Sequence, residues 1–196
     1  DDSTHKHLTK IEDPNGNALH FTGFLAWNQP QFITDPSGRS LRLAWTGGRL
    51  TQLVDSISSP PRTTSYQYDA RGNMVRAIDQ AGNMTQYQYD VRSRLVKITD
   101  PRSNSVAIAF NDSGAVTSVT TPATPDAPPT DMSFVYDVPG SRTLVSEFVA
   151  GAVQTSVYTF NPQGKVTRIQ SNTPGYDVQY EYDAENNITR TVDANG

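Results

Sequence analysis

The sequence contains no cysteine among its 196 residues, which excludes a disulfide framework, thiolate metal sites and cysteine catalysis. Charged residues make up only 18% of the chain, too few for a disordered polyelectrolyte or a coiled coil. The formal net charge is −4, which disfavours a nucleic-acid-binding protein. No apolar run approaches the roughly 18 residues that a membrane-spanning helix needs.

Glycine and proline, in contrast, are plentiful. There are 13 of each, while hydrophobic residues make up only 35% of the chain. A chain this rich in turn-forming residues is not typical of a helical bundle. It shows neither an initiator methionine nor a signal peptide, so we expect it to be a segment of something longer.

A four-residue pattern recurs along nearly the whole chain. Each copy has an apolar residue, any residue, an aromatic residue and then a turn-forming residue. Two copies lie 21 residues apart, at residues 66–69 and 87–90. Further copies lie at 108–111, 134–137, 158–161 and 180–183, and weaker copies with tryptophan lie at 25–28 and 43–46.

The spacing within each copy predicts a β-strand with one apolar face. Side chains alternate along a strand, so the two large residues of each copy lie on the same side. The residues that we expect in this packed stripe are Tyr66, Tyr68, Tyr87, Tyr89, Phe110, Tyr136, Phe160, Tyr180 and Tyr182.

Each strand is followed by a predicted turn. An Asp side chain can accept backbone hydrogen bonds, and a glycine three residues later can adopt a positive φ. The candidate turn residues are Asp69, Asp90, Asp137 and Asp183, with Gly72, Gly114, Gly140 and Gly164, and with Asn186 in the glycine position of the last copy. A second turn of the Asp-Pro or Asp-x-x-Gly type follows, as at residues 79–82 and 100–101, and two N-terminal copies lie at 13–16 and 35–38. The repeat is therefore a hairpin of about 21 residues, and we expect an all-β fold of serial antiparallel hairpins.

Apolar pairs in the second strand of each hairpin are spaced by three residues. Examples are Leu50 and Leu53, Val116 and Val119, and Val166 and Ile169.

 Leu95 and Ile98 share this spacing. Strict alternation would place the two members of a pair on opposite faces, so either a β-bulge resets the face or both faces are buried. Polar flanking residues favour the bulge.

Proline-rich stretches interrupt the repeat. We expect loop excursions near residues 56–64 and 122–130 and a turn at 173–175, and no helix beyond single turns. Strand content should exceed the average of roughly 20–25% found in globular proteins.

Residues for catalysis or metal binding are not grouped in the sequence. His5 and His7 would share a face of an extended segment, but His20 is the only other histidine, and a metal site needs three or four ligands. The carboxylates fall at turn positions, where they have a local hydrogen-bonding role. We therefore expect neither enzyme activity nor a metal or cofactor.

Repeated aromatic residues in a polar β-framework leave a second interpretation open, a glycan- or protein-binding repeat module. Exposed aromatic faces would favour sugar stacking, whereas packed rings would favour a structural stripe. The exposure of Tyr66, Tyr87 and Trp45 distinguishes the two interpretations.

The motif Tyr-x-Tyr-Asp-x-x-Gly, followed by an apolar pair and a second Asp turn, resembles the YD repeat of the Rhs family over about residues 8–196. This family includes bacterial Rhs effectors, often exported by type VI secretion, the C components of insecticidal toxin complexes, and animal teneurins. The resemblance implies that residues 1–196 are a single segment of about nine repeats in a ribbon that forms part of a curved β-shell. The absence of cysteine disfavours a teneurin-like adhesion segment.

The resemblance also implies a function. Bacterial members of the family, the polymorphic toxins, enclose a toxin or cargo polypeptide within the shell for secretion. The expected partners are the remainder of the parent shell, an encapsulated toxin domain and a secretion apparatus, with no nucleic acid and no membrane span. The expected location is bacterial, stored in the cytoplasm and then secreted or delivered from the cell surface.

Overall fold

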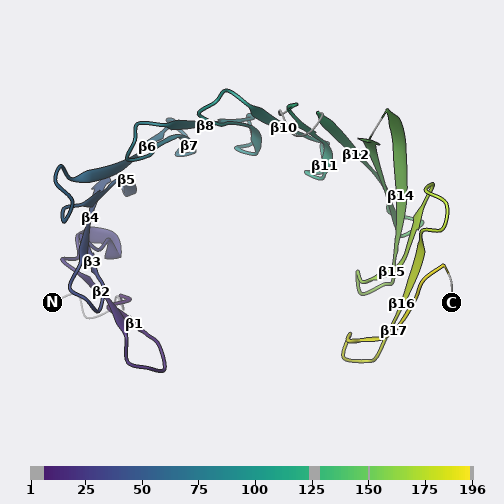
Figure 1. The fold of residues 1–196 in the computed structure, drawn as a ribbon, viewed down its shortest axis with the longest axis horizontal. Coiled ribbons are helices and arrows are strands. Elements are labelled where there is room, and N and C mark those ends of the chain that lie inside the picture. The colour runs from purple at the N-terminus through teal and green to yellow at the C-terminus, as the bar shows by residue number, and fades with distance from the viewer. Residues whose placement is uncertain (1–6, 124–128, 150, 195–196) are drawn as a thin grey trace. The chain divides into compact units, whose positions relative to one another are not determined.

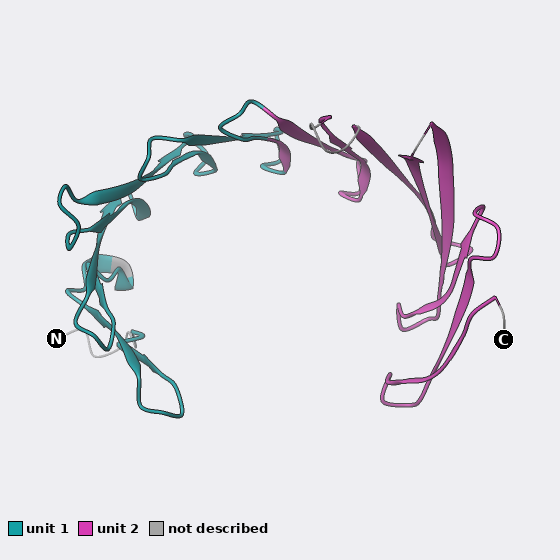
Figure 2. Ribbon diagram, viewed as in Figure 1, with its two compact units in different colours: residues 1–94, 99–103 teal, residues 95–98, 104–196 magenta. Residues whose placement is uncertain are grey.

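The computed structural model describes residues 7–123, 129–149 and 151–194. The chain forms two compact units, residues 1–94 with 99–103 and residues 95–98 with 104–196 (Figure 2). Within the described residues, the regular elements are β-strands and a single 3-10 turn at Ala26–Asn28. The expectation of a strand-rich chain without helices beyond single turns is therefore confirmed. No helix in this part of the chain is long and apolar enough to cross a membrane.

The first unit is an antiparallel meander of consecutive strands (Figure 1). Each strand pairs with the next one along the chain, from β1 to β8. The strands are β1 (Lys10–Glu12), β2 (Ala18–Thr22), β3 (Phe32–Thr34), β4 (Ser40–Thr46), β5 (Arg49–Asp55), β6 (Arg62–Tyr68), β7 (Met74–Ile78) and β8 (Met84–Tyr89).

The second unit repeats this arrangement from β10 onward, again with antiparallel pairing of consecutive strands. Its strands are β9 (Leu95–Thr99), which pairs with β10, β10 (Ser105–Phe110), β11 (Val116–Thr121), β12 (Thr130–Asp137), β13 (Arg142–Val149), β14 (Ala152–Phe160), β15 (Val166–Ser171), β16 (Asp177–Tyr182) and β17 (Ile188–Val192). The all-β class and the serial antiparallel hairpins are confirmed.

The three-residue spacing of the apolar pairs is explained by β-bulges. Phe110 pairs with Val116 and Ile108 pairs with Val119, with a register shift between Ala109 and Phe110. Equivalent shifts occur in the β4–β5, β6–β7, β14–β15 and β16–β17 hairpins. Directly paired residues share a face, so the bulge returns both members of the apolar pair to the side that carries the aromatic residues. The bulge interpretation is confirmed for these hairpins.

The ribbon buries little of its own apolar surface. The described hydrophobic residues that are buried are Ala18, Leu43 and Val54, which are 7–8% exposed. No described polar or charged residue is buried. Each unit is thus a sheet whose strands pack mainly against their neighbours in sequence, not around a central core.

One expected repeat copy is wrong. Residues 25–28 were expected to form a strand, but they lie in the connection that joins β2 to β3, whose last pair is Thr22 and Phe32. Asn28 has a φ of 58°, and the Leu25 N–H donates to the Gln29 carbonyl across a tight loop. Pro30 follows and has no N–H to give to a ladder, so this segment turns instead of extending.

The predicted proline-rich loops differ at their ends from the observed ones. The loop expected at 56–64 ends earlier, because Arg62, Thr63 and Thr64 pair with β5 as the start of β6. The loop expected at 122–130 includes residues 124–128, which lie outside the described residues, while Thr130 pairs with Thr121 in the sheet. The turn at 173–175 is present, with a φ of 80° at Gly175.

Candidate functional site

The expected aromatic stripe lies on one face of the ribbon, which we call the aromatic face. In the first unit this face carries Tyr66 opposite Ala77 and Tyr68 opposite Met74. Thr85 of β8 pairs with Ala77, so alternation along β8 places Tyr87 and Tyr89 on the same face. The stripe predicted for β6 and β8 is therefore continuous across neighbouring hairpins.

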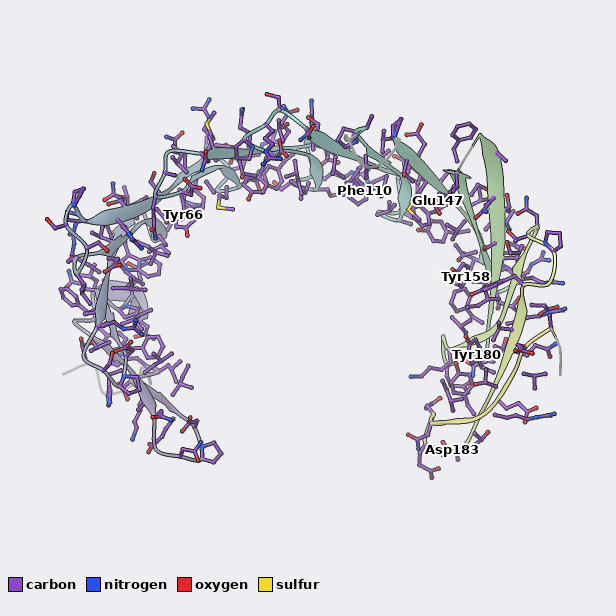
Figure 3. The ribbon with its side chains drawn as sticks, viewed as in Figure 1. Tyr66, Phe110, Glu147, Tyr158, Tyr180 and Asp183 are labelled. Atoms are coloured by element: carbon purple, nitrogen blue, oxygen red, sulfur yellow. The ribbon has the colours of Figure 1, made fainter. Side chains whose placement is uncertain are left out.

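The second unit has an aromatic face of its own, on which Figure 3 shows Phe110, Tyr158 and Tyr180. Register places the remaining predicted residues on this face as well. The pairs are Phe110 with Val116, Tyr136 with Thr143, Phe160 with Val166, Tyr180 with Thr191 and Tyr182 with Ile188. Alternation along each strand thus places the second unit's stripe as the sequence predicts.

The opposite face, which we call the polar face, carries most of the charge in the second unit. Among the paired residues of β10–β17, Glu147 is the one charged residue on the aromatic face. The charged residues in pairs on the polar face are Asp131, Asp137, Arg142, Arg168, Asp177, Glu181 and Arg190. Several of them pair with one another, as Arg168 does with Asp177. The two faces therefore offer different chemistry to whatever lies against them.

The aromatic side chains are neither fully exposed nor fully buried. Tyr66, Tyr87 and Trp45 are each half-buried. The indole N–H of Trp45 donates to the carbonyl oxygen of Pro30 at 2.9 Å, so its polar edge is used within the chain. Gln67, between Tyr66 and Tyr68, is exposed. These features favour a packed stripe over a set of open sugar-stacking platforms.

The Asp turns have one recurring geometry, illustrated by Asp69. Its backbone N–H donates to the Asn73 carbonyl at 2.9 Å, and its own carbonyl accepts from Gly72 N–H at 3.0 Å. Its Oδ1 accepts from the N–H groups of Arg71 and Asn73, both at 2.9 Å. Its Oδ2 accepts from the Asn73 side-chain amide at 3.0 Å. The carboxylate thus holds both sides of the turn.

The same turn occurs on both edges of the ribbon. The residues that begin these turns are Asp13, Asp35, Asp79, Asp90, Asn111, Asn161 and Asp183. The first and second turns of the repeat, which the sequence shows as separate motifs, are therefore one structure used twice.

Hydrogen bonds lower the pKa values of the turn aspartates. For Asp13, Asp69, Asp79 and Asp183 the largest cause is the side-chain amide of the asparagine four residues later. For Asp35 the Ser37 hydroxyl is the largest cause, and the pKa falls from 3.8 to about 2. These carboxylates are fully ionised at neutral pH, which suits hydrogen-bond acceptors and not general acids.

The residue four positions after each aspartate is a functional residue that sequence reasoning missed. It is asparagine or arginine where the turn begins with aspartate, and its side chain reaches back to the carboxylate. These residues are Asn17, Arg39, Asn73, Asn83, Arg94 and Asn187. Where the turn begins with Asn111 or Asn161, the position is Ala115 or Lys165. This correlation is visible in the sequence and could have revealed the pairing.

Three of the four predicted turn glycines have a positive φ. The values are 90° at Gly72, 91° at Gly114 and 76° at Gly164, and Asn186 takes the same conformation at 65°. The expectation is wrong for Gly140, because Asp137 pairs with Arg142 in the β12–β13 ladder and leaves a four-residue loop in which Ser141, with a φ of 49°, takes the left-handed position.

Position 140 needs a glycine for a different reason, which is that the loop leaves no room there for a side chain. The Gly140 N–H donates to Asp137 Oδ1 at 3.0 Å, and the other carboxylate oxygen, Oδ2, forms an ion pair with Arg142 at 2.5 Å. A Cβ at residue 140 would collide with Oδ2 of Asp137. The glycine therefore allows this carboxylate to fold back over its own turn.

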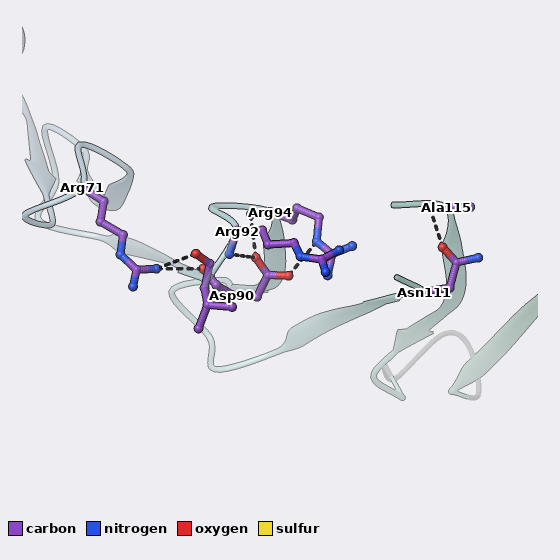
Figure 4. Close-up of polar contacts among 7 residues, drawn as sticks. Arg71, Asp90, Arg92, Arg94, Asn111 and Ala115 are labelled. Carbon is purple, nitrogen blue, oxygen red and sulfur yellow. Dashed lines mark hydrogen bonds and ion pairs between the residues drawn. The ribbon is translucent and has the colours of Figure 1, made fainter. Parts of the chain in front are cut away.

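Neighbouring turns on one edge of the first unit are joined by side chains (Figure 4). The Arg71 guanidinium donates to the carbonyl oxygen of Val91 at 3.0 Å. In that next turn, Arg94 pairs with Asp90 at 2.7 Å. Arg71 thus links one Asp turn to the following one, 21 residues along the chain.

The described histidines, His7 and His20, are not grouped with other ligands into a metal centre. His5 lies outside the described residues. His7 stacks on Phe24, with ring centroids 4.6 Å apart, and its Nδ1 lies 2.5 Å from Asn28 Oδ1. Within the described part of the chain, no group of three or more histidine or acidic side chains is placed to hold a metal ion.

Comparison with known proteins connects this geometry to a family. The family described as Teneurin YD-shell matches residues 1–120. A search of curated proteins found no match.

Solved structures share the fold. A chain in the crystal structure of TcdB2-TccC3-Cdc42 has a TM-score of 0.69 and 18% identity over 91% of this chain. A chain of TcdB2-TccC3 without the hypervariable C-terminal region has a TM-score of 0.68 and 20% identity, also over 91%. A chain of the Photorhabdus luminescens Tc holotoxin pore has a TM-score of 0.61 and 19% identity over 93%. The present chain spans only 10% of the length of each of these chains.

The serial antiparallel strand pairing agrees with the fold shared with these structures. The resemblance to the YD repeat is confirmed, and the chain belongs to the Teneurin YD-shell family.

Proposed function

We propose that this chain is one segment of the wall of an Rhs-type shell that encloses a toxin or other cargo polypeptide for secretion, with the aromatic face toward the cargo. The observation that carries the proposal is the division of the second unit into an aromatic face with one charged paired residue and a polar face with seven. A wall between an enclosed polypeptide and water needs two such faces. Apolar side chains pack against cargo, while charged side chains remain hydrated.

The low burial of the ribbon supports the same role. Only three described hydrophobic residues are buried, so large side chains such as Tyr136 and Ile188 on the aromatic face, and Phe148 on the polar face, keep apolar area that further protein could cover. Covering such area is favourable by about 25 cal/mol for each Å². The chain spans 10% of the length of the solved chains that share its fold, which fits a segment whose wall is completed by the remainder of a parent shell.

The proposed role is structural and not enzymatic. The aspartates of the turns accept hydrogen bonds from their own backbone and have lowered pKa values, so their lone pairs and charge serve the hairpins. A general acid would instead need a raised pKa in a water-poor cleft.

Neighbouring residues of β13 provide a direct test of which face meets the cargo. Val145 pairs with Phe134 and Ser156 on the aromatic face, whereas Leu144 pairs with Val135 and Val157 on the polar face. Both side chains are half-buried. A photo-crosslinking amino acid at either position would sample opposite sides of the same strand.

The crosslinking variants should be produced in the native host and irradiated before the shell is purified. We expect Val145 variants to form a crosslink to one reproducible polypeptide, which becomes sensitive to added protease only after the shell is unfolded in denaturant. Leu144 variants should not capture it. Equal capture from both positions, capture only from position 144, or a captured polypeptide that is cleaved while the shell is folded would each overturn the proposal.

A further inference from the structure

Four tyrosine hydroxyls make the same long-range hydrogen bond. In each case the second aromatic residue of a repeat donates to a backbone carbonyl 15–20 residues earlier in the chain. The bonds run from Tyr68 to Leu50 at 2.8 Å, Tyr89 to Met74 at 3.0 Å, Tyr136 to Val116 at 2.8 Å and Tyr182 to Val166 at 2.6 Å. The donor and acceptor always belong to different hairpins.

The acceptors occupy one structural position. Each is the residue at the bulge that pairs with the second aromatic residue of the preceding hairpin. The pairs are Trp45 with Leu50, Tyr68 with Met74, Phe110 with Val116 and Phe160 with Val166. A bulge disrupts the regular ladder locally, so a carbonyl there is a suitable acceptor for a side chain.

The first aromatic residue of each repeat behaves differently, although it lies on the same face. The hydroxyls of Tyr66, Tyr87 and Tyr180 make no hydrogen bond with any described residue. Burial raises the pKa of Tyr89, which is consistent with a phenol enclosed by its neighbours. The two tyrosines of one repeat therefore have the same ring but different hydroxyl environments.

We infer that the hydroxyl of the second aromatic residue fastens each hairpin to the bulge of the preceding hairpin. At each junction between two neighbouring hairpins, the choice of tyrosine or phenylalanine at this position then determines how readily the two hairpins separate. Phe110 and Phe160 supply the ring without the hydroxyl. The tyrosine of the repeat is thus a positioning residue between repeats as well as an apolar residue within one.

Matched phenylalanine substitutions separate this role from simple packing. Tyr89→Phe removes a hydroxyl that binds the bulge, and Tyr87→Phe removes one from the same strand and face that has no acceptor. We would measure backbone hydrogen exchange by mass spectrometry on the purified full chain. The loss of a neutral hydrogen bond should increase exchange about two- to twelvefold in β7 and β8 of the Tyr89→Phe variant. Tyr87→Phe should leave exchange there nearly unchanged.

The gain of this hydrogen bond can be tested at Phe110, because Phe110→Tyr adds a hydroxyl group and keeps the packed ring. Leu95 precedes Phe110 by 15 residues, just as the acceptor Met74 precedes Tyr89, so Leu95 is the expected acceptor. Phe110→Tyr should therefore slow exchange in the β9–β10 region by a similar factor. The inference is overturned if Tyr89→Phe and Tyr87→Phe have equal effects, or if Phe110→Tyr leaves exchange unchanged or increases it.

Discussion

Replacing Tyr68 of β6 with alanine would remove three interactions that its side chain makes with the neighbouring strands β5 and β7. The ring is half-buried opposite Met74, the hydroxyl binds the Leu50 carbonyl at 2.8 Å, and the Arg49 guanidinium lies 5.9 Å from the ring centroid. A fully buried ring is worth 3–5 kcal/mol, so this half-buried one contributes about 2 kcal/mol. The hydrogen bond adds about 1 kcal/mol, which gives a total loss of about 3 kcal/mol.

Two neighbouring variants divide this loss into its parts. Tyr68→Phe should lower the free energy of unfolding by about 1 kcal/mol, because only the hydroxyl is lost. Gln67→Ala, on the exposed opposite face, should cost less than about 0.5 kcal/mol. Urea titration followed by intrinsic fluorescence would measure all three. Equal losses for Tyr68→Ala and Gln67→Ala would show that the assignment of the two faces is wrong.

The turns provide three further predictions. Gly72→Ala and Gly164→Ala should each cost about 1 kcal/mol in urea titrations, because both glycines have positive φ and a Cβ at position 72 meets only the flexible end of the Arg49 side chain. The absence of a loss at either position would contradict this reasoning. The contribution of Asp35 to the free energy of unfolding should be complete above about pH 4 and be lost as the pH falls toward 2, because the pKa of this carboxyl is lowered from 3.8 to about 2 in the folded state. Asp35→Asn should make the acid part of the pH profile less steep. A profile that this substitution leaves unchanged would refute the assignment. Gly140→Ala should lower the free energy of unfolding by more than about 1 kcal/mol, because its Cβ would collide with the Asp137 carboxylate. Thermal denaturation would measure this loss, and an unchanged transition temperature would argue against that contact.

The strand and turn pattern could be predicted from the sequence because both depend on local chemistry. Alternation fixed the face of Tyr66 and Tyr68, and the three-residue spacing of Val116 and Val119 indicated a bulge that register confirms. The false copy at residues 25–28 matched the same pattern, but a proline two residues later and a positive φ at Asn28 make it a loop. Local pattern therefore identifies a strand only where the flanking residues allow a ladder.

Contacts between repeats could not be predicted in the same way. Nothing in the local pattern distinguishes Tyr87 from Tyr89, because their different hydroxyl environments arise from the preceding hairpin. Gly140 matched the glycine position of the motif, yet the pairing of Asp137 with Arg142 changes the loop length and puts the left-handed conformation at Ser141. These features depend on loop length and on neighbouring strands, which a short motif does not contain.

The pairing of every strand with its neighbours in sequence has a consequence for synthesis on the ribosome. Within each unit, a strand contacts the strand just before it and the strand just after it. A new hairpin therefore finds its partner already made as it leaves the exit tunnel, and no strand has to wait for a distant part of the chain. Such a ribbon can assemble from its N-terminal end at the pace of translation, which limits the time during which a strand edge is open to misassembly.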